Sequence, residues 1–367
     1  MNKENNQNGG GKPKPHLYLI WRNFKRHKLA MAGLAILIVI FAMSFFSGFI
    51  APHNYKQHHN NYTYLSPQRI RIFDDGQLSR PFVYGIERKL NEETYSWEYE
   101  INKEEKYYIK FFVHGDTYRF WGLCKTDIHL FGAGENAPLY LFGTDKVGRS
   151  LFSRVLWGGR ISLSIGFLGT AVTIITGLIV GGISGYYGGW VDMLVQRMTE
   201  LQMSFPRLPL WMALSTILPS NWSSIQIYAG MVAVLSIISW GGFSREIRGL
   251  VLSKRKEDYI MAARAAGADN RSIIVHHIFP SVLSHSIVVS TLTVPLLILG
   301  EASLSFLGLG IKPPMTSWGV LLKVGQNVET LTSHPWILIA GGFIVLTILA
   351  FNFVGDGLRD AVDPFSE

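Results

Sequence analysis

The sequence is poor in cysteine and in charged residues. It holds one cysteine, Cys124, among 367 residues, and a single thiol forms neither an intramolecular disulfide nor a metal site. Only 16% of the residues are charged, whereas a soluble domain usually carries about 25%. The deficit is local, because the charges cluster and long stretches have none. This pattern is typical of a polytopic membrane protein rather than of a soluble protein with a large core.

The sequence also lacks the signatures of several kinds of enzyme. It has no G-x-x-x-x-G-K-[ST] loop for phosphate binding, and the glycine-rich stretch GGRISLSIG lacks the lysine that such a loop needs. No nucleophile stands at a recognisable spacing from a base and an orienting group. The adjacent pair His276 and His277 is poor metal geometry without further ligands. We therefore expect no catalytic, cofactor or metal site, and no ATP hydrolysis by this chain alone.

The cations gather in two segments and give the chain a net charge of +8. Six lysines and arginines lie between Lys12 and Lys28, directly before the first apolar run, and seven lie between Arg245 and Arg271. Nucleic-acid binding needs a basic stripe with interleaved aromatic residues, which is not the pattern here. Cations beside apolar runs instead set the orientation of a membrane protein, because they stay in the cytoplasm. We expect membrane lipid, and no nucleic acid, as a partner.

Uncharged apolar runs divide much of the chain. Residues 29–50 form a run of 22, long enough to cross about 30 Å of hydrocarbon, and we interpret it as a retained anchor rather than a cleaved signal. The uncharged run 208–244 is too long for one helix, and LPSNW (218–222) predicts a turn that divides it; the first of these two helices is expected to begin before Pro206. The remaining predicted spans are 161–191, 281–300 and 336–354. Six spans place both termini and the cation-rich segment in the cytoplasm.

Residues 51–160 differ in kind from the apolar runs. They hold 15 Lys/Arg and 13 Asp/Glu, so this stretch is nearly neutral and suited to water. Alternating aromatic and polar residues in KYYIKFFVHGDTYRFWG predict two strands joined by a tight turn at His114-Gly115-Asp116. RIRIF and PFVYGIE are further strand candidates. We predict a small β-rich domain outside the cytoplasmic membrane.

A short polar-edged stretch, YIMAARAAGADNRSIIVHHIFP (Tyr259–Pro280), lies between two long apolar runs. Glu257–Ala266 contains good helix formers with small side chains. Gly267 is well placed to end that helix, and Asp269 can cap a second helix that runs toward Pro280. The face expected to be free at helical spacing consists of Tyr259, Ala262, Ala263 and Ala266.

Physical chemistry leaves two interpretations of this stretch open. It can be an amphipathic connector that lies on the lipid headgroups, favoured by its cations. It can also present a flat alanine face to another protein, because small side chains allow a close approach.

The same stretch resembles the cytoplasmic "EAA" loop of ABC-importer permeases, in which a Glu-Ala-Ala triplet precedes a glycine and a proline follows. Ala262 and Ala263 fit the triplet, Gly267 fits the glycine and Pro280 fits the proline. Met261 departs from the pattern, because it stands where the family has its glutamate. Glu257 and Asp258, one turn earlier, are the nearest acidic residues.

Three further motifs extend the resemblance. FGTDKVGRSLFSRVLWGGRISLSIG (142–166) is similar to the entry of the second span in peptide-importer permeases, GEASLSFLGLGIKPPMTSWGVLL (300–322) to their outer loop after the fifth span, and GDGLRDAVDP (355–364) to their C-terminal signature. The chain thereby resembles the C-type permease subunit of oligopeptide and dipeptide ABC importers from residue 142 onward and in its N-terminal anchor. The stretch 54–139 is longer than we expect for that family, and the resemblance implies no role for it.

The resemblance implies a fold and an organisation. The expected fold is an all-α polytopic membrane protein with six transmembrane helices of the type I ABC-importer permease fold, located in a bacterial inner membrane. The expected parts are a cytoplasmic tail (1–28), a first transmembrane helix (29–50), an extracytoplasmic β-rich insertion (51–141) and a permease core (142–367) with a coupling loop (254–280).

The resemblance also implies partners and roles. In the family, this loop couples the permease to separate subunits that bind ATP and Mg. Glu257, Asp258, Tyr259, Ala262, Ala263, Ala266, Gly267 and Pro280 would carry that role here. The ATP-binding subunits are expected to number two, and the other implied partners are a B-type permease paralogue, an extracytoplasmic solute-binding protein and a peptide substrate. Related permeases carry nickel chelates and other solutes, and a self-contained secondary transporter is the alternative from another class.

Two polar positions outside the loop have competing interpretations. Glu301 lies at the outer end of the fifth predicted span and is a candidate for the outer gate, or an interfacial residue that is locally paired or hydrated. Asp145 and Arg149, four residues apart, are expected to pair and to cap the entry helix, or else to face the solute-binding protein. Arg154 and Arg160 are expected to be interfacial anchors.

Overall fold

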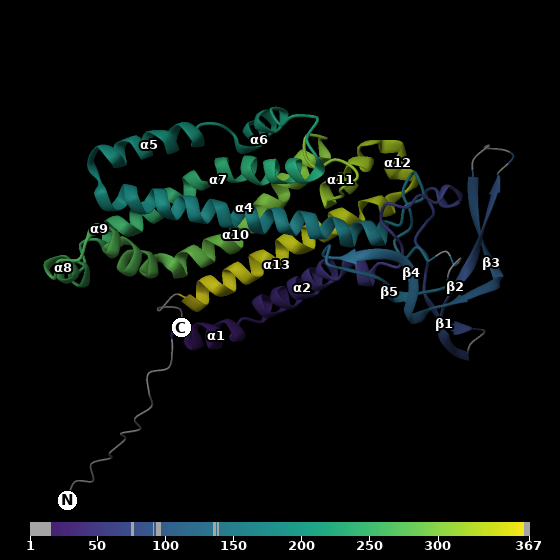
Figure 1. The fold of residues 1–367 in the computed structure, drawn as a ribbon. Helices are drawn as coiled ribbons and strands as arrows, with labels where there is room; N and C mark the ends of the chain where they lie inside the picture. The colour runs from purple at the N-terminus through teal and green to yellow at the C-terminus, as the bar shows by residue number, and fades with distance from the viewer. Residues whose placement is uncertain are drawn as a thin grey trace, which may run out of the picture.

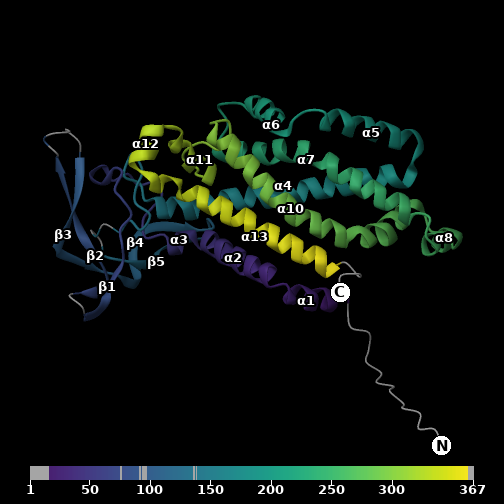
Figure 2. The same ribbon diagram turned by 180° about the vertical axis from the view of Figure 1, so that it is seen from behind.

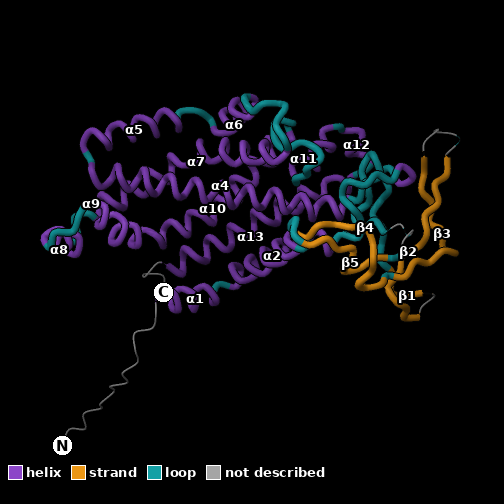
Figure 3. The backbone as a smooth tube through the Cα atoms, in the orientation of Figure 1, coloured by secondary structure: helices purple, strands orange, loops and turns teal. Residues whose placement is uncertain are grey.

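The computed structural model describes residues 16–362 apart from 75, 76, 91, 93–96, 135, 136 and 138. The expected polar tail lies largely outside this part, as do the last residues of the C-terminal motif. Long helices pack side by side, and the strands lie at one end of them (Figures 1 and 3). Five helices in the described part are long and apolar enough to cross a membrane: Lys28–Phe45, Leu151–Tyr187, Ser224–Lys254, Asn270–Phe306 and Pro335–Val362.

The N-terminal helices pack against the C-terminal helix. Helix α1 (His16–Arg26) leads through His27, whose Nδ1 accepts the Ala30 amide hydrogen and caps α2 (Lys28–Phe45). Helix α13 (Ile339–Val362) runs beside α2, and its end lies beside α1, as both ribbon views show. Gly357 permits this approach, because a Cβ there would overlap the Ala30 side chain. The two ends of the described chain therefore meet at one end of the molecule.

Helices α4 (Leu151–Tyr187) and α7 (Ser224–Lys254) pack closely through small residues. A Cβ at Gly181 would overlap the Ser244 carbonyl oxygen, and one at Gly185 would lie 2.8 Å from the Arg248 carbonyl oxygen. Glycines four residues apart let helix backbones approach in lipid, where packing rather than hydrophobicity drives association. The glycines of the run 161–191 therefore let α4 and α7 pack closely.

The segment between α4 and α7 differs from the expected single helix before residue 218. It contains α5 (Gly189–Met203) and α6 (Arg207–Thr216), which follow one another alongside α4 and α7 (Figure 1). The break falls at Ser204–Pro206, because Pro206 has no amide hydrogen to continue the helix. The predicted turn at 218–222 is confirmed, and Ser223 begins α7 with a capping box to Gln226.

The remaining elements complete the helical part. They are α8 (Asp258–Ala265), α9 (Asn270–Ser272), the π-helical turn η2 (Ile273–Ile278), α10 (Phe279–Phe306), α11 (Trp318–Leu322), η3 (Lys323–Gln326), α12 (Val328–Ser333) and η4 (Pro335–Leu338). Helix α8 lies at the end of the helices opposite the strands, and α11 and α12 lie at the strand end (Figures 1 and 2).

The strands lie between α2 and α4 in the chain and form two antiparallel sheets. One sheet has the order β1 (Arg71–Asp74), β2 (Gln77–Leu90), β3 (Trp97–Tyr108); the other pairs β4 (Lys110–Phe120) with β5 (Cys124–Gly132). Short elements α3 (Ser47–Ile50) and η1 (Asn60–Tyr62) precede them. The predicted strands at RIRIF and PFVYGIE are confirmed by β1 and β2.

The predicted turn at residues 114–116 is wrong. These residues lie inside β4, where the pairing with β5 shifts register between His114 and Tyr118. The chain reverses instead at Trp121 and Gly122, whose φ angles are +50° and +79°, and the Leu123 amide returns to the Phe120 carbonyl at 3.0 Å. The glycine at 115 marks an irregularity in a strand, which is the other common meaning of a glycine in a strand pattern.

Candidate functional site

Helix α8 stands at the end of the molecule with little of its surface covered. Ile260 is its buried residue, and it packs in a cluster with Ile247 and Val251 of α7 and with Ile273. One buried isoleucine fixes which face of this short helix turns inward. The opposite face is therefore set by helical geometry and stays open.

The open face of α8 agrees largely with the predicted one. Tyr259 and Met261 are 42% and 51% exposed, and Ala262 and Ala266 are exposed beside them. Ala263 is half-buried. The side chain at the position of the family's glutamate is thus an exposed thioether, while the Glu257 carboxylate accepts a hydrogen bond from Lys254 at 2.9 Å.

Gly267 ends α8 as the sequence predicts. Its φ is +85°, and its amide donates to the Arg264 carbonyl at 3.0 Å while the Ala268 amide donates to the Ala263 carbonyl at 3.1 Å. These two bonds form a Schellman motif, in which a left-handed residue satisfies the last carbonyls of a helix. The predicted cap at Asp269 is also present, because its side chain accepts the Ser272 amide at 3.3 Å.

The second helix differs from the predicted short one. The structure continues from α9 through the π-helical turn directly into α10, so Pro280 lies in the first turn of a long helix rather than at the end of a short one. The Phe279 amide bonds the Ile274 carbonyl, five residues back. This wider turn accommodates the proline ring, which would otherwise clash with the carbonyl four residues before it.

Polar bonds tie the loop to the end of α4. The Tyr186 hydroxyl donates to Asn270 Oδ1 at 2.7 Å and accepts from the Arg264 guanidinium at 3.1 Å. Arg255 donates to the carbonyl oxygens of Gly185 and Tyr186, both at 3.1 Å. Displacement of α8 therefore pulls directly on the end of α4.

An open hollow of about 610 Å³ lies beside α8 and is lined by this same group of residues. It is cationic, because Arg255, Lys256 and Arg264 contribute to it together with Tyr186, Tyr187, Met261 and Asn270. A surface of this kind suits a partner with acidic groups around an apolar contact.

An ion pair joins the start of α5 to α7 near the same end. Arg248 Nε and Nη2 donate to the two carboxylate oxygens of Asp192, each at 2.5 Å, and the Ser184 hydroxyl donates to Asp192 at 2.6 Å. This two-point pairing holds the guanidinium in one orientation. It links the end of α4, α5 and α7 into one unit.

Glu301, the candidate outer-gate residue, is fully buried in α10, with 0% of its surface exposed. Its carboxylate accepts hydrogen bonds from Ser162 of α4 at 2.8 Å and from Ser305 at 2.6 Å. The Ser162 hydroxyl in turn accepts the Trp318 amide at 3.1 Å. Its burial excludes a hydrated side chain, while its bonds to Ser162 and Ser305 agree with the alternative of a locally paired residue. Glu301 joins α4, α10 and the start of α11.

Asp145 and Arg149 pair as predicted, but in a buried setting. Asp145 is 1% exposed, and its carboxylate accepts the amides of Val147 and Arg149 at 3.0 Å and the Arg149 guanidinium at 2.8 Å. Ser150 rather than Asp145 caps α4. Arg154, expected as an interfacial anchor, is 4% exposed and binds the same carboxylate. One carboxylate that serves two guanidiniums explains why Arg154 can be buried.

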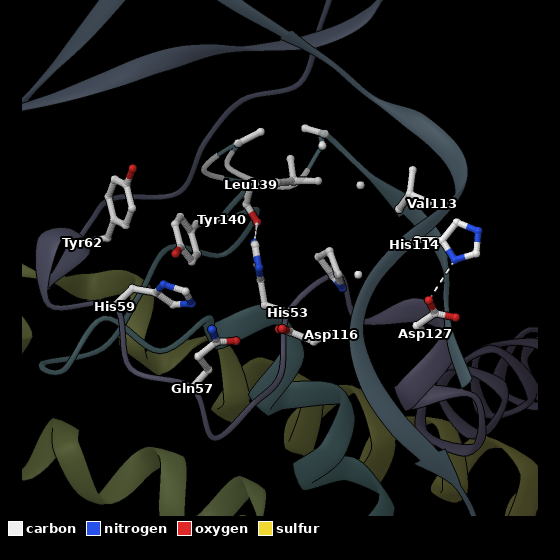
Figure 4. A pocket seen from close by; sticks show the side chains of 16 residues that line it. His53, Gln57, His59, Tyr62, Val113, His114, Asp116, Asp127, Leu139 and Tyr140 are labelled. Atoms are coloured by element: carbon white, nitrogen blue, oxygen red, sulfur yellow. Dashed lines mark hydrogen bonds and ion pairs between the residues drawn. The ribbon is translucent and has the colours of Figure 1, made fainter. Parts of the chain in front are cut away.

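A polar pocket of about 590 Å³ lies between the chain after α3 and the β4–β5 sheet (Figure 4). His53 donates to the Leu139 carbonyl at 3.2 Å and stacks on Tyr140, with 5.0 Å between ring centroids. Burial, and the neighbouring His59, lower the pKa of His53 from 6.5 to about 4. Burial also lowers the pKa of His59. These histidines are therefore neutral at physiological pH.

Comparison with known proteins places this geometry in a family. The family described as "Binding-protein-dependent transport system inner membrane component" matches residues 174–366, and the "N-terminal TM domain of oligopeptide transport permease C" matches residues 17–67. The chain belongs to this family of transport permeases. It is a multi-pass inner-membrane protein, and the resemblance to C-type permeases is confirmed.

Individual relatives support the same assignment. The dipeptide transport system permease protein DppC of Alkalihalophilus pseudofirmus is 42% identical over 61% of this chain and 71% of its own length. The oligopeptide transport system permease protein OppC of Haemophilus influenzae is 43% identical over 65% of this chain and 75% of its own length. DppC of Bacillus subtilis is 30% identical over 99% of this chain and 91% of its own length, a match that spans residues 51–141 as well.

Sequence reasoning missed the residues that hold the loop in place. Tyr186, Arg255 and Asn270 lie outside the recognised motif, and their contact partners come from helices far apart in the chain. It also missed the pocket at His53. The sequence signal for that pocket was three histidines within seven residues, His53, His58 and His59. Their spacing does not predict which distant residues they contact.

Proposed function

We propose that this permease forms half of the membrane pathway of an ATP-driven peptide importer, and that α8 docks against separate ATPase subunits. The observation that carries the proposal is the combination of exposure and attachment in α8. Its outer face is open and carries Ala262 and Ala266 beside Tyr259 and Met261, while its base is bonded to α4 and continues into α10. A helix held in this way passes a push from a partner to the membrane helices, whereas a loose loop would absorb it.

The relatives favour peptides as the substrate. Their names specify dipeptide and oligopeptide transport. A permease of this family for another solute, such as a nickel chelate, is the second candidate. The long uncharged spans disfavour a self-contained secondary transporter, because such proteins usually carry charged coupling groups near the middle of the membrane.

We infer six membrane crossings with both termini in the cytoplasm. Helix α4 ends, and α7 begins, toward opposite ends of the helical part, so the chain that contains α5 and α6 must cross between them once (Figure 1). This gives a sixth crossing made of two shorter helices. The end that carries α1, α8 and the end of α13 also carries most cations of the segment 245–271, which favours the cytoplasmic side.

The proposed orientation places the two sheets outside the cytoplasm. There, residues 51–141 would form the insertion and 142–367 the permease core, with 254–280 as the coupling loop. A role of residues 54–139 in docking the solute-binding protein is supported by the position of the two sheets at one end of the helices (Figure 1). The remaining proposed partners are a B-type permease paralogue and two ATPase subunits that bind ATP and Mg.

Glu301 is proposed as part of the outer gate. Its carboxylate joins α4, α10 and the segment that leads to α11, all at the strand end. Opening of the pathway toward the outside would separate these elements. A buried carboxylate held by hydroxyl groups offers bonds that can break and re-form during such a movement.

The test is co-purification of ATPase subunits from detergent-solubilised native membranes, identified by mass spectrometry. Ala262→Trp places a bulky ring on the open face of α8, and Val328→Trp, at a site 75% exposed on α12, is the matched control at the opposite end. We expect wild type and Val328→Trp to retain the ATPases and Ala262→Trp to lose them. If correctly folded wild type retains no ATPase in any of several mild detergents, the proposal is wrong.

A further inference from the structure

The end of the β4–β5 hairpin is apolar and open. We call residues 120–124, FWGLC, the hairpin tip. Trp121 is 41% exposed and Leu123 is 86% exposed. Trp121 also adopts a φ of +50°, a conformation that non-glycine residues rarely take. The backbone conformation of Trp121 is strained, and large apolar side chains exposed to water are unfavourable. The tip should therefore have an apolar environment that covers these side chains.

The contacts of the tip with the end of α2 give a first indication of its depth relative to the membrane. The Phe120 ring lies 6.0 Å from Phe45 and 5.9 Å from Phe46, and the Trp121 ring lies 4.9 Å from Phe45. Phe45 ends α2 and Phe46 follows it in the turn before α3. They precede Ile50, the end of the uncharged run, by five and four positions. The tip therefore lies beside residues of the uncharged run, before that run ends.

The second measure comes from α4 and is independent of the first. The Arg160 guanidinium carbon lies 3.6 Å from the centre of the Trp121 ring. Arg160 is the last charged residue before the uncharged run 161–191. A cation at this position marks the boundary between headgroups and hydrocarbon, which is also where tryptophan rings gather. Two helices therefore place the tip at the same level.

The charges behind the tip fit the same boundary. Arg119 and Lys125 face each other across the hairpin, directly behind Phe120 and Cys124. Their long side chains can reach phosphate groups while the residues in front of them stay among acyl chains. Phe45 and Phe46 are themselves 48% and 43% exposed, so the apolar surface of the membrane helix continues onto the tip without a break.

We propose that the hairpin tip inserts into the bilayer interface at the strand end of the molecule, with phospholipid as its partner. The insertion is then anchored to the membrane at two places, through α2–α3 and through the tip. The inference rests on the membrane-spanning helices and is independent of coupling to ATPases. It assigns a lipid contact to the hairpin tip, which is part of the segment between α2 and α4.

Cys124 allows a direct test, because it is the chain's one cysteine and is exposed in the tip. A nitroxide label on Cys124 of the full chain in phospholipid nanodiscs reports collisions with oxygen, which concentrates in lipid, and with a water-soluble nickel chelate. The matched control is Cys124→Ser combined with Lys103→Cys, which moves the label to an exposed position on β3. We expect collisions to favour oxygen at Cys124 and the nickel chelate at residue 103.

Two outcomes would overturn the proposal. Equal access of the nickel chelate to both labels would show that the tip lies in water. Low access of both reagents to Cys124 would show that a protein surface covers it. As a second readout, a fluorophore on Cys124 should be quenched more strongly by lipids that carry a quencher near the headgroup than by lipids that carry it near the chain end. Quenching that is equal for both lipids would also count against insertion at the interface.

Discussion

The hydroxyl of Tyr186 and the guanidinium of Arg264 lie 3.1 Å apart and join the end of α4 to α8. The same hydroxyl donates to Asn270 at 2.7 Å, so one phenol holds both ends of the turn around Gly267. The Arg264 guanidinium also lies over the Tyr186 ring, 5.7 Å from its centre. Besides the packing of Ile260, the position of α8 relative to the membrane helices therefore depends on a side chain that precedes Arg264 by 78 residues.

Tyr186→Phe should loosen α8 without unfolding the protein. The variant keeps the buried ring and loses both hydrogen bonds of the hydroxyl. At about 1 kcal/mol for each bond, the loss is about 2 kcal/mol, or roughly a 30-fold rise in opening of the loop. Hydrogen exchange of residues 257–270 measures this opening. In reconstituted complexes, peptide transport should fall while the ATPases remain bound.

Tyr187→Phe is the matched control for that change. Tyr187 is adjacent in the sequence and 54% exposed, so loss of its hydroxyl should leave exchange and transport near wild-type values. Equal effects of the two substitutions would show that the bonds of Tyr186 do not hold the loop. Unchanged exchange in Tyr186→Phe would lead to the same conclusion.

Gly267→Ala should destabilise the end of α8 through the backbone alone. A Cβ at Gly267 has no heavy atom within 4 Å, so space is not limiting, but its φ of +85° disfavours any residue with a Cβ. The expected cost is about 1 kcal/mol. Gly267→Asn should cost less, because asparagine enters the left-handed region more readily. Thermal unfolding and hydrogen exchange of residues 258–268 measure both variants.

Gly249→Ala separates conformation from bulk. A Cβ at Gly249 would also have no heavy atom within 4 Å, but this glycine lies within α7 and its φ is not positive. Alanine there should be neutral or stabilising by up to about 1 kcal/mol. A similar loss of stability in both alanine variants would contradict the argument from φ.

Hydropathy and capping residues predicted the features of this fold that depend on local sequence. The uncharged runs gave the positions of the five long helices, and Gly267 and Asp269 gave the caps of the loop. Each of these depends on neighbours within a few residues along the chain. The physical reason is that each backbone segment in lipid must satisfy its own hydrogen bonds. An uncharged run that is long enough to span the membrane therefore predicts a helix.

Features that depend on distant partners could not be predicted in this way. Arg154 looked like an interfacial cation, because its buried partner Asp145 sits in a preceding loop whose shape the sequence did not show. Pro280 looked like a helix end, because the π-helical turn that accommodates it has no sequence signal we recognised. The predicted turn at His114-Gly115-Asp116 failed because a bulge and a turn use the same residue types.

Asp145→Asn should be strongly destabilising. The change leaves the buried Arg154 guanidinium beside an amide instead of a carboxylate, and it also removes the partner of Arg149. Breaking a buried ion pair from one side costs about 3–5 kcal/mol, because a buried charge loses its compensation. The yield and thermal stability of the detergent-solubilised chain measure the loss.

Arg197→Gln is the control for the loss of an ordinary ion pair. Arg197 pairs with Glu200 on α5, and their side chains are 77% and 45% exposed. Removing an exposed pair of this kind should cost less than about 1 kcal/mol. An Asp145→Asn variant as stable as Arg197→Gln would show that the buried cluster does not contribute to stability.

The pocket at His53 should make the outer part of the chain sensitive to acid. Burial, and then the charge of a nearby His59, lower the pKa of His53 from 6.5 to about 4, while Asp116 opposes this shift. Above the ordinary pKa of 6.5 both the closed and the opened forms are neutral, and the stability is fully present. As the pH falls from 6.5 toward 4, the opened form binds a proton that the closed form does not, so stability is lost.

The loss from His53 should reach at most about 3 kcal/mol and should level off below its pKa in the closed form. Hydrogen exchange of residues 52–62, corrected for the intrinsic pH dependence and compared at about pH 7.5 and about pH 5, measures it. His53→Phe keeps a ring against Tyr140 and should remove most of this pH dependence. His58→Phe, at an exposed neighbouring histidine, should retain it. The proposal fails if His58→Phe abolishes the acid sensitivity and His53→Phe does not. The source of the acid sensitivity would then be a surface charge near η1 rather than His53.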